Sequence, residues 1–311
     1  MSYIFGIDLG GTTVKIGIFD ELANIIEQWE IPTRQEENGK YIIPDMANSI
    51  NEKIKEHNFD KKDIKGVGIG IPGPVDDNGV VIKFPNLGWK NMDISKELGS
   101  LINIPVKVEN DANVAALGEM WQGGAKGYKN VVFVTLGTGV GGGIIINNKL
   151  INGSHGAGGE IGHIKVKFDE TQTCGCGGHG CLEQYASATG IVRMTKELLK
   201  ESSEPSSLRD IENITAKDIL DAAKNSDKIA NEIVDKFGFY LGSALANIAA
   251  IVDPEIFIIG GGVSKAGEIL IDSIEKYYQK CCFSSCANVK FAIASLGNSA
   301  GIYGAAKLIV G

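Results

Sequence analysis

The sequence predicts an α/β protein of two similar domains, and three observations support this. The chain has 311 residues, which exceeds what one compact core comfortably holds and suits two domains of ordinary size. Hydrophobic residues make up 43% of it, so both domains can bury a core. A unit of strand, glycine turn and strand occurs twice, over residues 3–19 and again over residues 130–146. This recurrence indicates two copies of one fold that face each other across a cleft.

The first copy occupies the N-terminal part of the chain. Residues 3–9 form an apolar run typical of a buried strand, and residues 14–19 alternate as a second strand after a glycine turn. Residues 25–31 are expected to add a third strand. The pattern then predicts helices over residues 44–57 and 111–121 and strands over residues 66–71 and 106–108.

The second copy begins with two strands that again flank a glycine turn, and helical spacing of apolar residues dominates the chain after it. The predicted strands are residues 130–136, 141–146 and 256–259, and the predicted helices are residues 187–200, 215–223, 227–252 and 298–310. We place the domain boundary after residue 110. Residues 1–110 with about 298–311 form the smaller domain, and residues 111–297 form the larger one, with a cysteine-rich loop over residues 163–183.

Charge and cysteine content narrow the function. Lys and Arg number 30 and Asp and Glu 38, so the formal net charge is 30 − 38 = −8, which disfavours general binding to DNA or to an anionic membrane. The N-terminal residues do not resemble a secretory signal, and no apolar stretch approaches the roughly 20 residues that span a bilayer. We therefore expect a cytoplasmic protein that binds neither nucleic acid nor membrane. Its six cysteines are expected to be thiols or metal ligands rather than disulfides.

Two glycine turns are candidates for phosphate binding, because glycine lets backbone N–H groups approach a phosphate closely. They are Gly10, Gly11, Thr12 and Thr13, and Gly137, Thr138 and Gly139. Each alone is typical of a tight hairpin, and Asp8 alone is typical of a carboxylate that caps such a turn. Together they indicate a polyphosphate site. The chain has no Gly-Lys-Ser/Thr phosphate loop, and the later turn leads into a strand rather than the helix that a dinucleotide motif requires.

A cysteine-rich loop predicts a metal site. Cys174, Cys176 and Cys181 place three thiols within eight residues, and His163 and His179 lie close in sequence. Zinc prefers four tetrahedral sulfur and nitrogen ligands, and a site closed by four protein ligands is structural. The spacing alone does not decide which histidine is the fourth ligand. A second group of cysteines has no histidine nearby and is expected to consist of ordinary thiols (Cys281, Cys282 and Cys286).

Several motifs together resemble the ROK family, a name that covers repressors, open reading frames and kinases. Residues 8–12 (Asp-Leu-Gly-Gly-Thr) resemble the first phosphate loop of actin-like sugar kinases. The motifs that resemble the ROK family itself are residues 109–113 (Glu-Asn-Asp-Ala-Asn), residues 159–163 (Gly-Glu-Ile-Gly-His) and the very specific Cys-x-Cys-Gly-x-x-Gly-Cys-x-Glu pattern of residues 174–183. Residues 72–74 and 85–89 are most similar to its bacterial glucokinase branch. The resemblance covers essentially the whole chain.

The resemblance implies a two-domain actin-like (ribonuclease H-like) ATPase fold and ATP-dependent phosphorylation of a hexose, most directly of glucose to glucose 6-phosphate. It implies that Asp111 is the general base. Other sugar hydroxyls would bind to Gly73, Asn86, Asn110, Glu160, His163 and Glu183. A structural Zn²⁺ would bind to His163, Cys174, Cys176 and Cys181, which leaves His179 out. Phosphates would bind at Gly10, Gly11, Thr12, Thr13, Gly137, Thr138 and Gly139, adenosine at Gly260, Gly261, Gly262 and Val263, and Mg²⁺ near Asp8. The family also implies a homodimer or a tetramer.

The alternatives fall into two classes. For single residues, Asn110 or Asp111 could cap the helix that follows them, and Glu160 and Glu183 could be surface charges. For the whole chain, a kinase of N-acetylmannosamine or another hexose is the nearest alternative, and a sugar-responsive regulator without kinase activity is the alternative of a different class. A repressor needs a DNA-binding module, typically a helix-turn-helix ahead of the fold. The first predicted strand starts at residue 3, so we expect the enzyme.

Overall fold

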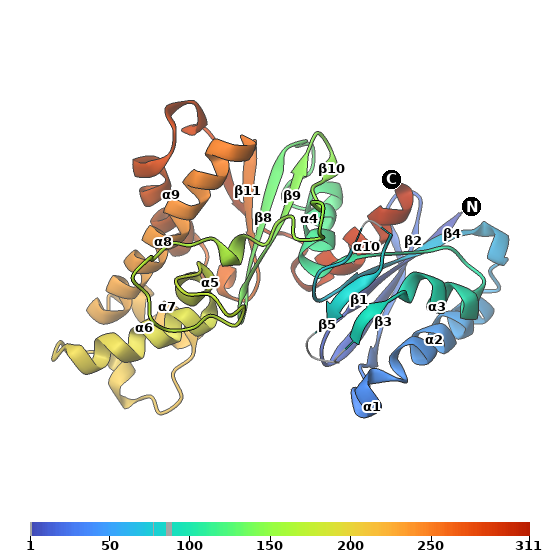
Figure 1. Cartoon of the computed structure of the whole chain (residues 1–311), viewed down its shortest axis with the longest axis horizontal. Coiled ribbons are helices and arrows are strands. Elements are labelled where there is room, and N and C mark those ends of the chain that lie inside the picture. The colour runs from blue at the N-terminus through green and yellow to red at the C-terminus, as the bar shows by residue number, and fades with distance from the viewer. Residues whose placement is uncertain (1, 77, 85–88) are drawn as a thin grey trace. The chain divides into compact units, whose positions relative to one another are not determined.

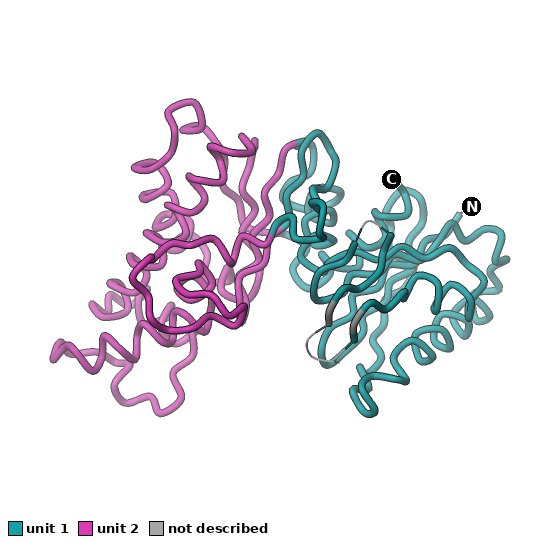
Figure 2. The backbone as a smooth tube through the Cα atoms, in the orientation of Figure 1, with its two compact units in different colours: residues 1–129, 143–159, 295–311 teal, residues 130–142, 160–294 magenta. Residues whose placement is uncertain are grey.

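The computed structural model describes residues 2–76, 78–84 and 89–311. The chain divides into two compact units, which are coloured separately in Figure 2. Unit 1 comprises Met1–Lys129, Gly143–Gly159 and Ser295–Gly311, and unit 2 comprises Asn130–Gly142 and Glu160–Ala294. Residues 111–129 and 143–159 thus group with unit 1, whereas the boundary predicted after residue 110 assigns them to the larger domain.

Unit 1 is built on a mixed five-stranded sheet in the order β3-β2-β1-β4-β7, and Figure 1 labels β1, β2, β3 and β4 of it. Strands β1, β2 and β3 pair antiparallel, and β4 and β7 run parallel to β1. The strands are β1 (Tyr3–Leu9), β2 (Thr13–Asp20), β3 (Ile25–Pro32), β4 (Ile64–Ile71) and β7 (Val106–Asn110), with β5 (Val81–Phe84) and β6 (Trp89–Met92) as a separate pair. The helices are α1 (Glu36–Gly39), α2 (Ile42–Glu56), α3 (Ile94–Ile102), α4 (Asp111–Gln122) and α10 (Ala300–Val310), with 3₁₀ turns η1 (Lys61–Asp63) and η6 (Gly297–Ser299).

Different helices cover the two faces of this sheet, because successive residues of a strand point to opposite faces. Phe5 and Ile7 of β1 join a core with the apolar faces of α2 and α3. Ile4, the residue before Phe5, packs on the other face with Phe19 and with Ile302 of α10. The nearly continuous apolar run of β1 therefore matches a sheet that is covered on both sides.

Glycines let α10 lie directly on the backbone of its neighbours. A Cβ on Gly68 of β4 would come 1.7 Å from the backbone oxygen of Ala305, and a Cβ on Gly304 would come 1.5 Å from that of Val114 in α4. Both distances are impossible for a real side chain, so only glycine fits there. The close packing of α10 on α4 and β4 thus explains the small residues in this helix.

A second five-stranded sheet has the order β10-β9-β8-β11-β12. Its strands are β8 (Val131–Leu136), β9 (Val140–Ile146), β10 (Lys149–Leu150), β11 (Ile256–Gly260) and β12 (Lys290–Ile293). The helices of unit 2 are α5 (Glu183–Ala186), α6 (Ala188–Glu201), α7 (Ala216–Lys224), α8 (Lys228–Val252) and α9 (Glu268–Cys281), with 3₁₀ turns η2 (Ile161–His163), η3 (Ser207–Asp210), η4 (Val263–Ala266) and η5 (Ser284–Cys286).

The two sheets share one topology. Counted along the chain, the strands of each sheet lie in the order third, second, first, fourth, fifth. The fourth and fifth strands run parallel to the first. A glycine turn joins the first strand to the second in both sheets. The predicted α/β fold with a duplicated unit is therefore confirmed.

The longest helix of unit 2 is α8, with 25 residues. Asp227 begins it by accepting a hydrogen bond from the N–H group of Ala230 at 3.1 Å, and Asp253 ends it in the left-handed conformation with φ 45°. Ile233, Phe237 and other residues at helical spacing are buried. In the part of the chain that the structure describes, neither this helix nor any other is both long and apolar enough to cross a membrane.

Candidate active site

The junction between β7 and α4 carries the predicted general base. The Oδ1 atom of Asn110 accepts hydrogen bonds from the N–H groups of Ala112 at 2.9 Å and Asn113 at 3.1 Å, so Asn110 is the N-cap of α4. The Nδ2 group of Asn110 donates to the backbone oxygen of Gly73 at 3.1 Å. Asp111 follows as the first helical residue, where the helix dipole stabilises a carboxylate, and it is half-buried. Of the two capping alternatives, Asn110 is the cap.

A buried carboxylate that the sequence did not single out lies at the same junction. Glu109 is 6% exposed and accepts hydrogen bonds from Nδ2 of Asn113 at 3.0 Å and Nδ2 of Asn152 at 2.7 Å. It also accepts one from the N–H group of Asn110 at 2.8 Å. These charge-assisted bonds fix the end of β7 to the first turn of α4. The orientation of Asn110 and Asp111 therefore depends on Glu109.

The first glycine turn is tied down through its carbonyl groups. The N–H group of Gly10 donates to the backbone oxygen of Thr13 at 3.0 Å. The hydroxyl of Thr33 donates to the backbone oxygen of Gly10 at 2.7 Å, and the side-chain amide of Gln35 donates to that of Gly11. Since protein donors satisfy these carbonyl groups, the turn can offer N–H groups and hydroxyls to an anion.

Asp8 ends β1 immediately before this turn. It lies against the first turn of α10, where a Cβ on Gly301 would come 2.7 Å from the Cγ atom of Asp8. Burial raises the pKa of the Asp8 carboxyl, and the ammonium of Lys15 partly offsets this. A cation bound beside Asp8 would compensate the desolvation of its charge, which fits the predicted position of Mg²⁺.

The second glycine turn abuts the N-terminus of α6. The N–H group of Ala188 donates to the backbone oxygen of Gly137 at 2.8 Å, and the hydroxyl of Thr189 donates to that of Thr138 at 2.9 Å. These bonds hold the turn in one conformation. As in the first turn, the carbonyl groups accept hydrogen bonds from the protein, so an anion would bind to the backbone N–H groups of the turn.

Glu183, which is predicted to bind a sugar hydroxyl, contacts this second turn. A Cβ on Gly139 would lie 2.2 Å from the Oε2 atom of Glu183, so only glycine leaves room for the carboxylate. The same oxygen accepts a hydrogen bond from the N–H group of Val140 at 3.3 Å. Glu183 is therefore held by the turn that is predicted to bind phosphate.

A pocket of about 460 Å³ lies beside the second turn in unit 2. It brings Gly137 and Thr138 together with Gly262 and Val263, which the sequence had assigned to phosphate and adenosine. Helix α7 and turn η4 supply further lining residues that the sequence did not single out: Ala216, Lys217, Leu220, Lys224, Lys265 and Ala266. A pocket with apolar walls next to a phosphate-binding turn suits the flat base of a nucleotide.

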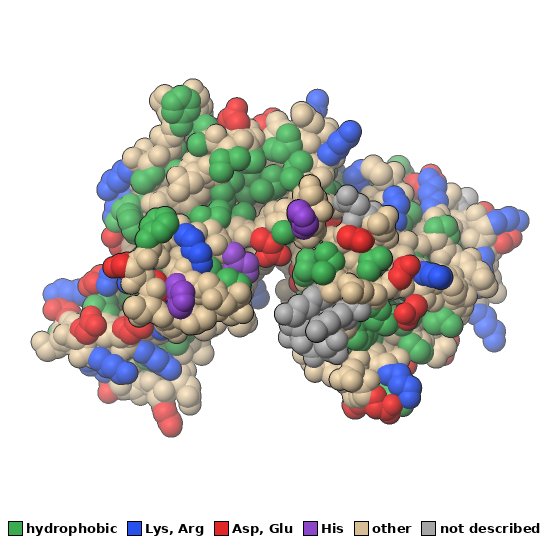
Figure 3. All heavy atoms as spheres, in the orientation of Figure 1, with side chains coloured by type: hydrophobic (Ala, Val, Ile, Leu, Met, Phe, Trp, Pro, Cys, Tyr) green, Lys and Arg blue, Asp and Glu red, His purple; other side chains and the backbone are tan. Residues whose placement is uncertain are grey.

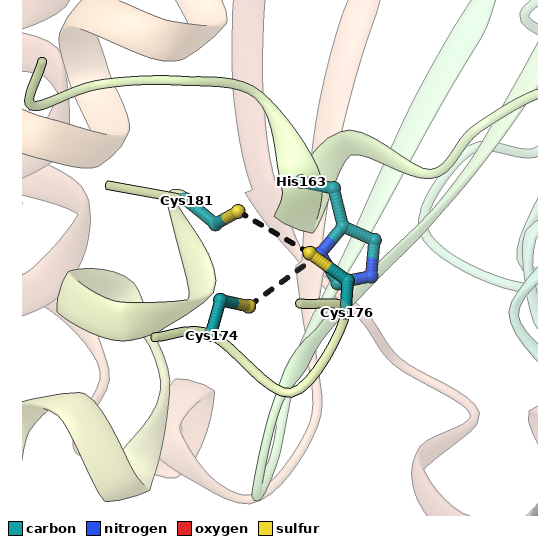
Figure 4. A group of neighbouring side chains, drawn as sticks. All are labelled: His163, Cys174, Cys176 and Cys181. Atoms are coloured by element: carbon teal, nitrogen blue, oxygen red, sulfur yellow. Dashed lines mark hydrogen bonds between the residues drawn. The ribbon is translucent and has the colours of Figure 1, made fainter. Parts of the chain in front are cut away.

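The four predicted zinc ligands form one group, which we call the four-ligand cluster (Figure 4). The ligand atoms of His163, Cys174, Cys176 and Cys181 all lie within 4.8 Å of one another. The two sulfur atoms of Cys176 and Cys181 are 3.7 Å apart, and Cys174 Sγ is 3.9 Å from His163 Nδ1. A tetrahedron with metal–sulfur distances of about 2.3 Å has edges of about 3.8 Å, so the cluster has the size of a zinc site. His179 is exposed and lies outside it.

Two predicted sugar-binding carboxylates each lie against one residue of the four-ligand cluster. Glu160 Oε2 is 3.8 Å from His163 Nε2, the ring nitrogen that does not face Cys174. Glu183 Oε1 accepts a hydrogen bond from Cys174 Sγ at 3.4 Å, and burial raises the pKa of that thiol. The cluster thus orients both carboxylates, as groups around a metal site commonly orient one another.

A carboxylate between the ligand segments anchors the loop to the helices behind it. The phenol of Tyr185 donates a hydrogen bond to Glu170, and the N–H group of Gln172 donates to Oε1 of Glu170 at 2.9 Å. These donors lower the pKa of Glu170 to about 2. The Tyr185 ring stacks on Tyr240 of α8 with 4.2 Å between ring centroids. The loop before Cys174 is therefore fixed to α5 and α8.

The predicted site residues divide between the two units. Unit 1 contains Asp8, Gly10–Thr13, Gly73, Asn110 and Asp111. Unit 2 contains Gly137–Gly139, Glu160, Glu183, Gly260–Val263 and the four-ligand cluster. Asn86 lies outside the described residues. Cys281, Cys282 and Cys286 are free thiols that join no potential metal site within the described ranges.

Comparison with known proteins decides the family. The ROK family model matches residues 4–311. A glucokinase of Halalkalibacterium halodurans is 41% identical over 98% of this chain and 94% of its own length, and one of Streptomyces coelicolor is 37% identical over 99% and 98%. The crystal structure of a ROK family glucokinase from Streptomyces griseus in complex with glucose and AMPPNP has a TM-score of 0.80 at 36% identity, covering 99% of both chains. The chain belongs to the ROK family.

The similar ROK kinase structures identify the observed fold. The pair of mixed sheets with equal strand order is the actin-like ATPase fold of the similar ROK kinase structures. The resemblance seen in the motifs is therefore confirmed, including its glucokinase branch.

Sequence reasoning missed two groups of residues in this ROK-family chain. The lining residues of α7 look like any amphipathic helix, because a side chain that faces a pocket and one that faces a core follow the same spacing. Glu109 and Asn152 contact each other across 43 positions, which no local pattern shows. Glu109 did stand inside a recognised motif, and that was the signal that could have singled it out.

Proposed function

We propose that this chain is an ATP-dependent hexose kinase that phosphorylates glucose to glucose 6-phosphate. The observation that carries the proposal is 41% identity to a glucokinase over 98% of the chain. A similar glucokinase was solved with glucose and AMPPNP, which supports a nucleoside triphosphate as the phosphoryl donor. A sugar hydroxyl is a weak nucleophile, so catalysis depends on positioning and on neutralising charge.

In unit 1, Asp111 acts as the base that takes the proton from the attacking hydroxyl. A carboxylate within hydrogen-bond reach of that hydroxyl contributes about 10²–10⁴ in rate. The position of Asp111 at the start of α4, on a turn held by Glu109 and Asn110, supports this role. The Nδ2 group of Asn110 carries a second N–H for a sugar hydroxyl besides the one bound to Gly73. Gly73 and Asn86 complete the sugar contacts of this unit.

In unit 2, the other sugar hydroxyls form hydrogen bonds with Glu160, His163 and Glu183. Their contacts with the four-ligand cluster support a rigid arrangement, which a sugar site needs in order to distinguish one hydroxyl pattern from another. A structural Zn²⁺ bound by the cluster would hold these side chains in place and would take no part in phosphoryl transfer.

Each unit supplies groups for the nucleotide: unit 1 the first glycine turn, and unit 2 the second glycine turn with its pocket. Phosphates bind the N–H groups and hydroxyls of Gly10–Thr13 and Gly137–Gly139. Adenosine occupies the pocket formed by Gly260–Val263 and α7, whose apolar lining supports a bound base. Mg²⁺, held near Asp8, would neutralise charge on the phosphates.

The chain functions as a cytoplasmic homodimer, and a tetramer is the alternative assembly. Its partners are hexose and ATP, not nucleic acid or membrane. The net charge of −8 and the interspersed acidic and basic side chains on the face drawn in Figure 3 support the absence of a general nucleic-acid surface. Light scattering tests the assembly: a mass of 33.0 kDa, that of one chain, would contradict it.

A coupled assay of ADP release tests the activity. Zinc-loaded protein is incubated with Mg²⁺-ATP and with glucose, N-acetylmannosamine, N-acetylglucosamine, mannose, fructose or allose. Asp111→Asn serves as the control for contaminating kinases, because it removes the base and little else. We expect the highest kcat/KM for glucose.

The other outcomes are equally informative. A clear preference for another sugar would reject glucose and retain the kinase, with a change at the sugar-binding residues. Folded, zinc-loaded protein that turns over none of the six sugars would reject the kinase and favour a sugar-responsive regulator. Replacing ATP by polyphosphate in the same assay identifies the donor.

A further inference from the structure

A lysine outside the four-ligand cluster contacts one of its thiols. The ammonium group of Lys165 donates a hydrogen bond to Cys181 Sγ at 3.0 Å. The backbone determines this contact, because Lys165 and Cys181 lie opposite each other in an antiparallel bridge. The N–H group of Leu182 donates to the backbone oxygen of Ile164 at 2.8 Å and extends the pairing. Lys165 is exposed overall, so it is not needed to fill the core.

Gly178, in the loop between Cys176 and Cys181, leaves room for this ammonium group. A Cβ on Gly178 would lie 2.5 Å from Lys165 Nζ, so a side chain there would push the ammonium away from the thiol. The N–H group of Gly178 lies 3.5 Å from Cys176 Sγ and donates to it. Cys176 therefore receives an amide donor, and Cys181 receives a charged one.

The charges around the four-ligand cluster explain why a cation is useful there. Three thiolates and a neutral imidazole around Zn²⁺ carry one net negative charge. Glu160 lies 3.8 Å from His163, and Glu183 lies 3.4 Å from Cys174, so two carboxylates add to it. Lys165 supplies a positive charge next to Cys181. The hydrogen bond from this ammonium group also fixes the position of the Cys181 sulfur atom.

We propose that Lys165 is a positioning residue of the zinc site, which holds the Cys181 thiolate on the metal and slows its release; this rests on the zinc site of the proposed function. Residues that orient metal ligands typically change metal affinity by about 10- to 100-fold. We therefore expect removal of the Lys165 charge to accelerate zinc release by about tenfold or more.

Three variants of the full chain test this role by zinc release rather than by activity. Lys165→Met removes the charge at nearly constant length, and Lys165→Arg retains a cationic donor. Lys167→Met is the matched control, because Lys167 lies 4.0 Å from Glu170 in an ion pair. Zinc content is measured by mass spectrometry, and release is followed with the coloured chelator 4-(2-pyridylazo)resorcinol. We expect fast release from Lys165→Met and near-wild-type release from the other two.

The outcomes separate this inference from the zinc site itself. If the wild type and Lys165→Met both contain stoichiometric zinc and release it at the same rate, the role of Lys165 is refuted and the zinc site stands. If the purified wild type binds no zinc even when it is supplied, the zinc site is refuted and the role of Lys165 with it. Should Lys165→Met fail to fold by circular dichroism, Lys165→Gln gives the same comparison.

Discussion

A buried carboxylate at the far end of α4 provides a quantitative test of the fold. Glu119 is 0% exposed. Its Oε2 atom accepts hydrogen bonds from the N–H groups of Gly124 at 2.8 Å and Ser295 at 3.0 Å, and its Oε1 atom accepts one from Leu296 at 2.9 Å. One side chain thus joins the end of α4 to the residues after it and to the segment that leads into α10.

Glu119→Gln keeps the shape and removes the charge. Both oxygens of Glu119 accept hydrogen bonds from backbone N–H groups. In either orientation of the amide, its NH₂ group therefore replaces an acceptor, and at least one N–H group is left without one. A buried donor without a partner costs about 1–3 kcal/mol, and each remaining bond weakens by about 1 kcal/mol when the acceptor becomes neutral. We therefore expect a loss of about 3 kcal/mol or more in the free energy of unfolding. For a unit of this size that lowers Tm by about 6–12 °C.

Urea unfolding followed by tryptophan fluorescence measures this loss. All three tryptophans lie in unit 1 (Trp29, Trp89 and Trp121), so their emission reports on the unit that contains Glu119. The control is Glu56→Gln, which removes an exposed charge paired with Lys53 and is expected to cost less than about 1 kcal/mol. If Glu119→Gln is as stable as this control, the three N–H groups do not depend on the carboxylate and the reasoning fails.

Three further changes test the site. Asp111→Asn should lower kcat by about 10²–10⁴ and leave glucose binding in calorimetry intact; near-wild-type kcat would reject Asp111 as the base. Cys176→Ser, or chelation, should lower both Tm and glucose affinity, and full activity in verified zinc-free protein would reject a structural zinc. The folded pKa of Glu170 is lowered from 4.5 to about 2, so its stabilising contribution is present above pH 4.5 and is lost as pH falls toward 2. Tyr185→Phe should therefore flatten the dependence of Tm on pH in this window, and an unchanged profile would show that the phenol is not the cause.

Most elements with long, regular patterns were predicted from the sequence, although the 14-residue helix α9 was not. Strand β1 was predicted at its observed bounds, and helix α8 was predicted to within one residue. The four-residue strands β5, β6 and β12 and the nine-residue helix α3 were missed, because short segments carry too few residues to show a period. The start of α10 was predicted two residues too early, since residues 297–299 form a 3₁₀ turn.

The grouping of side chains was predictable where the residues lie close together in the sequence. Cys174, Cys176 and Cys181 lie close together in sequence, and the structure brings their sulfur atoms together with His163. The capping question was decidable only in three dimensions, because Asn110 and Asp111 both favour helix N-termini. The pocket lining from α7 and the Glu109–Asn152 bond arise from tertiary packing, which a single sequence does not display.

The contacts of Glu183 link the four-ligand cluster to a second part of unit 2. One of its oxygens lies against the second glycine turn, at Val140, and the other lies 3.4 Å from Cys174 Sγ. A side chain at position 139 would occupy the space of that carboxylate, and Gly139 leaves it open. A change in the four-ligand cluster therefore reaches the predicted phosphate-binding turn through a single side chain. If the proposed zinc is removed, we expect sugar binding and phosphate binding to weaken together, because the proposed sites for both contact Glu183.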